Sequence, residues 1–124
     1  WTNSNQLRVG RYGNGTLNVE AGGVVSNANG YIGHYVASTG EATVTGSGSQ
    51  WNNSVDLTVG RYSNGTLNVE AGGVVSNANG YIGRVEDSTG EATVTGSDSA
   101  VEHLPIPVHR WRQCGSRWQR DIEP

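Results

Sequence analysis

The chain has 124 residues, enough for one domain or for a short stretch of a larger array, and only 34% of them are hydrophobic, with 19 glycines and neither Met nor Phe. This composition excludes a conventional close-packed core and favours a repetitive core built from strands. A net charge of −3, from eight arginines without lysine and eleven acids, indicates no basic stripe for neutralising phosphates, so we expect no nucleic-acid partner. No apolar run reaches the length of about 18 residues that marks a membrane-spanning helix, so we expect no membrane insertion by this segment.

A 50-residue repeat organises the chain from its first residue. Residues 1–50 align with residues 51–100 without a gap, and 39 of the 50 positions are identical. We therefore divide the chain into repeat unit 1 (1–50), repeat unit 2 (51–100) and a non-repeat tail (101–124). Because the chain begins with Trp1 and lacks the features of a signal peptide there, we expect it to be a piece of a longer protein.

Short strands follow one another within each unit, in the order 7–10, 15–22, 31–33 and 40–46, which gives two strands in each half-unit. Asn-Gly and Gly-Gly pairs separate them, and these residues tolerate the positive φ angles of tight corners. The alternation of the longer strands places two sets of side chains inward, namely Leu17, Ala42, Leu67 and Ala92, and Val19, Val44, Val69 and Val94. The residues between them point outward, namely Asn18, Thr43, Asn68 and Thr93.

Two geometries are compatible with this pattern. Antiparallel hairpins are one, since Asn-Gly is a local hairpin signal, and a parallel β-helix in which successive coils stack is the other. A half-unit of about 25 residues is typical of a β-solenoid coil and too short for a propeller blade. We therefore predict an all-β fold, a right-handed parallel β-helix of about four coils with an irregular C-terminal tail.

The motifs NSVDLTVG (53–60), NGTLNVEAGG (64–73), GYIG (80–83) and GEATVTGSDS (90–99) closely resemble a repeat of bacterial surface proteins. That repeat occurs in autotransporter (type V secretion) passengers and in proteins with PEP-CTERM sorting signals, and the resemblance covers both units. It implies an exported β-helical stalk or passenger segment, secreted or held at the bacterial cell surface. It implies no particular activity.

Metal and cofactor binding are not expected. A calcium-binding β-roll needs repeated Asp, and the two units have Asp only at 56, 87 and 98. In the tail, the spacing of His103, His109 and Cys114 matches no zinc signature and a fourth ligand is missing. A single cysteine also makes no intrachain disulfide. The corner asparagines are better explained as ladders, formed by Asn27 and Asn77 or by Asn29 and Asn79.

The remaining polar and aromatic residues of the repeat are interpreted as structural. Glutamates recur once per coil, and we expect them at one register on the outer face rather than in a pair for glycoside hydrolysis, namely Glu20, Glu41, Glu70 and Glu91. The Arg-Tyr pairs at 11–12 and 61–62 are expected to pack at corners, with stacking on sugars as the alternative. We expect Trp1 and Trp51 to cover a coil junction, and His34, which Arg84 replaces in unit 2, to be a surface substitution.

The composition changes at residue 101. The tail holds all three prolines, the single cysteine and four of the eight arginines, but one glycine. It is either a cap, in which Trp111 and Trp118 cover the open end, or the out-of-frame translation of a third repeat, which we favour. On that hypothesis the tail adds no strand to the solenoid.

The sequence thus predicts a structural or adhesive segment of an exported bacterial surface protein, without catalytic activity of its own. Its expected partners are neighbouring repeats, surface glycans, or further copies bound through open strand edges. The alternative is part of a β-helical enzyme or binding protein for polysaccharides.

Overall fold

The computed structural model describes residues 1–84, 88–95, 100–102, 111–114 and 117–120, with side chains described up to residue 95. The described residues form strands and turns, with no helix long and apolar enough to cross a membrane. The strands lie in three sheets. One contains β1 (Gln6–Val9), β4 (Asn29–Ile32), β7 (Asp56–Val59) and β10 (Asn79–Ile82). The second contains β2 (Asn14–Val19), β5 (Thr39–Thr45), β8 (Asn64–Glu70) and β11 (Thr89–Val94), and the third contains β3 (Val24–Asn27), β6 (Gln50–Asn53), β9 (Val74–Ser76) and β12 (Ala100–Glu102).

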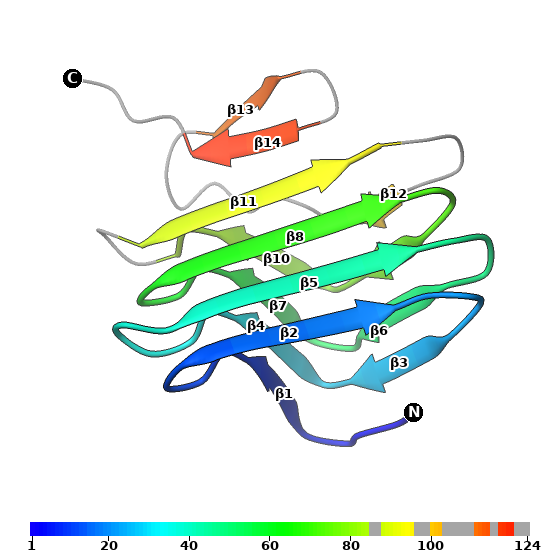
Figure 1. Cartoon of the computed structure of the whole chain (residues 1–124), viewed down its shortest axis with the longest axis horizontal. Helices are drawn as coiled ribbons and strands as arrows, with labels where there is room; N and C mark the ends of the chain where they lie inside the picture. The colour runs from blue at the N-terminus through cyan, green and yellow to red at the C-terminus, as the bar shows by residue number, and fades with distance from the viewer. Residues whose placement is uncertain (85–87, 96–99, 103–110, 115–116, 121–124) are drawn as a thin grey trace.

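These sheets are the sides of a right-handed parallel β-helix, which confirms the predicted fold (Figure 1). The chain passes through one strand of each sheet in turn and then returns to the first sheet, one strand further along. On the second sheet the register shift is 25 residues at every step, as Asn14 pairs with Thr39, Thr39 with Asn64, and Asn64 with Thr89. Each half-unit of the sequence is therefore one coil.

Each coil has three strands, whereas the sequence analysis predicted two. The additional sheet is the third one, β3–β6–β9–β12. Its strands differ between the half-units, since β3 reads VVSN and β6 reads QWNN. The internal similarity that revealed the other strands is absent there.

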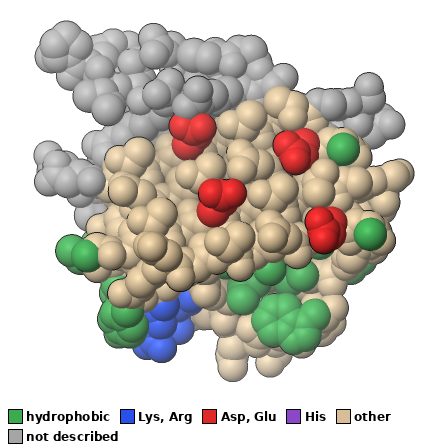
Figure 2. Space-filling view, viewed as in Figure 1, with side chains coloured by type: hydrophobic (Ala, Val, Ile, Leu, Met, Phe, Trp, Pro, Cys, Tyr) green, Lys and Arg blue, Asp and Glu red, His purple; other side chains and the backbone are tan. Residues whose placement is uncertain are grey.

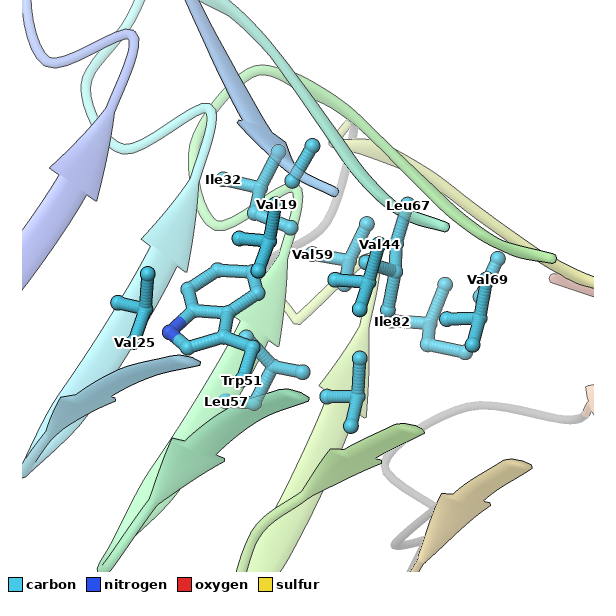
Figure 3. Close-up of a cluster of buried hydrophobic side chains, with 13 residues drawn as sticks. Val19, Val25, Ile32, Val44, Trp51, Leu57, Val59, Leu67, Val69 and Ile82 are labelled. Atoms are coloured by element: carbon cyan, nitrogen blue, oxygen red, sulfur yellow. The ribbon is translucent and has the colours of Figure 1, made fainter. Parts of the chain in front are cut away.

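The core ladders face inward as predicted. Val19, Val44 and Val69 are buried, and so are Ala42, Leu67 and Ala92. Leu17 and Val94, at the two ends of the stack, are partly buried and pack against this core. Figure 3 shows the valines and leucines of successive coils lying side by side in the interior. Asn18 is exposed and Asn68 half-buried on the outer surface, so the predicted strand register is correct.

Trp51 lies inside the core, which corrects the prediction that it covers a coil junction. Its side chain is fully buried, and its register partners are Val25 on β3 and Val75 on β9 (Figure 3). The equivalent Trp1 is 66% exposed. The reason is that described strands flank Trp51 on both sides, while Trp1 has a described neighbour, β3, on one side only.

Glycines fix the corner between the first two sheets. Gly10, Gly33, Gly60 and Gly83 have φ between 66° and 77°, where other residues are strained. The glycine at the second position of the next strand has no room for a side chain either, because a Cβ on Gly65 would lie 2.2 Å from the carbonyl oxygen of Ile32. The backbones of neighbouring coils therefore approach each other closely at this corner.

The tail contributes strands, so the prediction that it adds none is wrong. β12 continues the third sheet in parallel with β9. β13 (Trp111–Cys114) and β14 (Arg117–Arg120) form an antiparallel pair, and β14 pairs with the edge of β11. An antiparallel strand at this edge ends the parallel stacking, as a cap does. The origin of the tail, including the reading-frame hypothesis, stays a prediction.

Candidate functional site

Three columns of side chains, one residue per coil, form a face rich in arginine and aromatic rings. The first column lies on the outer surface of β1–β4–β7–β10 and consists of Arg8, Tyr31, Thr58 and Tyr81. The second follows the positive-φ glycine of each coil and consists of Arg11, His34, Arg61 and Arg84. The third, one residue further, contains Tyr12, Tyr35 and Tyr62. We call these three columns the basic face.

Backbone hydrogen bonds hold the second column in line. The N–H of His34 donates to the carbonyl of Gly10 (3.0 Å), that of Arg61 to Gly33 (3.0 Å), and that of Arg84 to Gly60 (2.9 Å). The column is thus set by the coil stacking itself.

Aromatic rings of unit 1 form a continuous stack across the columns. The ring of His34 lies between Tyr31 (centroids 4.3 Å apart) and Tyr35 (4.2 Å), and Tyr35 stacks in turn on Tyr12 (4.8 Å). The stack runs outward from the buried Tyr31 to Tyr12, which is 70% exposed. Such stacking adds to the hydrophobic gain and fixes the orientation of the outer ring.

Guanidinium groups lie over these rings. Arg11 is 5.0 Å from the ring centroid of Tyr12, and Arg61 is 5.5 Å from that of Tyr31. In the second unit Arg84 lies 4.3 Å from the centroid of Tyr81. Cation–π contacts of this kind restrict the arginine side chains before any ligand arrives. The sequence predicted corner packing for the Arg-Tyr pairs, and the contacts confirm it, but it missed the rings that neighbouring coils add.

His34 is buried within this face, so its assignment as a surface substitution is wrong. It is 1% exposed, because the loop that follows β4 folds its ring between two tyrosines. Its Nε2 lies 2.7 Å from Nη1 of Arg61. A guanidinium only donates, so Nε2 is the acceptor and the proton of the neutral ring is on Nδ1. Burial, and then the positive charges of Arg61, Arg8 and Arg11, lower the pKa of His34 to about 4.

Three buried polar atoms on the basic face have no hydrogen-bond partner in the structure. They are Nε of Arg8, Nδ1 of His34 and Oγ1 of Thr58. Burying an unsatisfied polar atom costs about 1–3 kcal/mol, so most buried groups in proteins are paired. Unused hydrogen-bonding capacity is therefore concentrated on this face.

The glutamates lie on a different side, over β2–β5–β8–β11, and at two registers rather than the predicted one. Glu41 and Glu91 are both in register with Thr66, whereas Glu70 is in register with Thr45. The half-units GTLNVE and GEATVT place Glu at different positions of the same strand, which explains the error. Figure 2 shows these acidic side chains standing apart on an open surface.

Asparagine side chains do link successive coils, but the predicted pairs Asn27–Asn77 and Asn29–Asn79 are two coils apart, with Asn53 and Asp56 between them. Nδ2 of Asn27 donates to Oδ1 of Asn53 (2.6 Å), and the Trp51 indole N–H donates to Oδ1 of Asn27 (2.6 Å), all buried. Asn53 therefore lies between the coils of Asn27 and Asn77. A cavity of about 270 Å³ opens beside this ladder, lined by Asn, Ser, Thr and Ala of segments 2–4, 26–28 and 52–54. It offers amide and hydroxyl groups but no charge.

The second ladder contains an acid. The backbone N–H of Asp56 donates to Oδ1 of Asn29 (3.2 Å), and Asn79 donates to Oδ1 of Asp56 (3.0 Å). Within the residues that the structure describes, no three His, Cys, Asp or Glu side chains come together as metal ligands. Asp87 and Asp98, and the tail set of His103, His109 and the side chain of Cys114, lie outside that description.

No family model matches the chain, and neither a curated protein nor a solved structure matches it. The candidate site therefore rests on its own geometry.

Proposed function

We propose that the chain is a structural and adhesive repeat segment of an exported bacterial surface protein, similar to an autotransporter passenger stalk, without catalytic activity of its own. The observation that carries this proposal is the stacking of two nearly identical 50-residue units on one continuous core. A solenoid of this kind extends by adding units, and each unit presents the same outer side chains again. Repetition of this kind serves display and multivalent attachment.

The glutamates argue against the alternative of a polysaccharide-degrading enzyme. Glu20, Glu41 and Glu70 are exposed on an open sheet, and the described cavity has no carboxylate in its lining. A glycoside hydrolase needs two carboxyl groups on either side of a bound sugar. Secretion or attachment at the cell surface is part of the proposal and is supported by the resemblance of the repeat.

Surface display tests the proposal. Chains with one, two and three copies of residues 51–100 are fused to an outer-membrane translocator, and the attachment of the cells to a glycan-coated surface is measured. We expect attachment to increase with the number of units, because each unit adds binding groups. An unrelated spacer of equal length is the control. Attachment that stays at the spacer level for all three chains contradicts the proposal.

A further inference from the structure

On the described part of the solenoid, the arginines and the glutamates lie on different surfaces. All four arginines with described side chains belong to the basic face, namely Arg8, Arg11, Arg61 and Arg84. Four glutamates lie over β2–β5–β8–β11 (Figure 2). Asp56 is the described acid on the β1–β4–β7–β10 sheet, and one of its oxygens already accepts a hydrogen bond from Asn79. The basic face thus favours an anionic ligand although the chain as a whole is negative.

In the second column the neutral ring of His34 separates Arg11 from Arg61, and Arg84 follows Arg61 on the next coil, where it lies over the ring of Tyr81. Arg11 and Arg61 are two coils apart, about 10 Å at the usual strand spacing, and His34 lies between them. Because Nε2 of His34 accepts from Arg61, the ring is neutral in this arrangement. One coil advances by about the length of one sugar in an extended chain. A polymer with an anionic group on every second sugar matches this spacing.

The exposed tyrosine rings and the guanidinium of Arg11 fit the rest of such a chain. Tyr12 and Tyr62 are 70% and 41% exposed, so part of each ring can contact a sugar, while Tyr35 and Arg11 contact Tyr12 and Arg61 contacts Tyr62. Arg11 is exposed and already oriented against Tyr12 and Tyr35. A guanidinium held in this way forms a bidentate contact with a carboxylate at a low entropic cost.

We propose that the basic face binds an acidic polysaccharide that alternates a uronic acid with a neutral sugar. The carboxylates pair with Arg11 and Arg61, and the intervening neutral sugar packs against the exposed tyrosine rings. This inference names the ligand of the adhesive surface and in that respect rests on the proposed function. Binding of a soluble polysaccharide, however, is measured without any cell surface.

Calorimetric titration of the full chain with hyaluronan, which has this alternating chemistry, tests the inference. We expect binding that weakens with added NaCl, and no binding of neutral dextran. Arg11→Gln should weaken binding about tenfold or more, as the loss of a charge-assisted contact does. Tyr12→Ala should weaken it severalfold. Both residues are exposed, so circular dichroism of both variants should match that of the parent chain.

Glu20→Gln, which follows β2 at the end away from Arg11, is the matched control and should bind hyaluronan as the parent does. The inference is overturned if the parent chain does not bind hyaluronan, if Arg11→Gln binds it equally well, or if oligothymidylate binds as tightly. It is also overturned if the chain self-associates through the basic face and Glu20→Gln abolishes that association, because the partner is then a second copy. Hyaluronan binding without unit-dependent cell attachment refutes the adhesive function alone, and the reverse result refutes the ligand alone.

Discussion

At positions 34 and 35 the differences between the two units, His34 against Arg84 and Tyr35 against Val85, change the chemistry of the surface. Arg84 lies over the ring of Tyr81, whereas His34 is inserted between two tyrosines and accepts a hydrogen bond from Arg61. The surroundings that keep the imidazole neutral come from the coils on either side. The sequence identified the substitution but not its burial, since the environment of His34 combines the neighbouring rings of Tyr31 and Tyr35 with Arg61, which is 27 positions away in the chain.

The stability of the protein should therefore depend on His34 at acidic pH. The folded-state pKa of about 4 lies below the value of 6.5 for an unperturbed imidazole, so the unfolded chain binds more protons between these two values. The stability that depends on a neutral His34 is fully present above about pH 6.5. It is lost as the pH falls towards 4, which lowers the free energy of unfolding by on the order of 3 kcal/mol. Urea unfolding at pH 4, 5, 6 and 7 measures this loss.

His34→Phe keeps a ring in the stack without the titration. The difference in unfolding free energy between the parent and this variant isolates the histidine from the carboxylates that titrate in the same range. We expect that difference to decline steadily on acidification. A constant difference from pH 4 to 7 contradicts the assigned environment.

At the scale of elements, the sequence predicted the strands that recur every 25 residues and missed those that recur only every 50. The inward ladders of β2, β5, β8 and β11 followed from a period-2 pattern that recurs every 25 residues. The third sheet was missed because β3 and β6 share no motif, and the buried place of Trp51 was missed with it. The basic face was missed in part, although a simple signal existed. Aligning Val9-Gly10 with Ile32-Gly33 places Arg11 and His34 in one column.

The glycine corner between the first two sheets leaves the least room for a side chain, as Gly65 shows. In Gly65→Ala the added Cβ would meet the Ile32 carbonyl oxygen at 2.2 Å and the Gly60 nitrogen at 2.5 Å, both backbone atoms. The coils would have to separate, so we expect a loss of more than about 3 kcal/mol in unfolding free energy. Gly13→Ala is the control, since no atom lies within 4 Å of a Cβ there. We expect this variant to change stability by less than about 1 kcal/mol, and equal denaturation midpoints for the two variants would contradict the corner geometry.

At the scale of the whole molecule, the solenoid is a stack whose ends differ from its middle. Parallel strands leave unpaired backbone groups at each end, and such edges recruit other chains. β14 occupies one such edge by pairing with β11. That an open edge needs cover follows from the repeat, whereas the strands of the tail do not, because the composition of the tail has nothing in common with the repeat.

Removing residues 103–124 should therefore increase self-association. The edge of β11 loses the strand that pairs with Glu91, Ala92 and Thr93, and it becomes free to pair with another copy. Sedimentation velocity should show dimers or larger species for residues 1–102 at concentrations where the full chain is monomeric. A truncated chain that stays monomeric and unfolds at the same denaturant concentration would show that the tail protects nothing.

The alternation of two unlike coils has a genetic consequence. Hydrogen bonds such as those from Asn27 to Asn53 and from Trp51 to Asn27 join an odd coil to an even one, so the smallest interchangeable piece is a pair of coils. The near-identity of the two units makes the DNA that encodes them prone to slipped recombination, in which the coding sequence of one unit pairs with that of the other. Each such event adds or removes fifty codons, keeps the reading frame and rejoins matching contacts at the new junction. We therefore expect related genes to differ in the number of fifty-residue units while the fold of every coil stays the same.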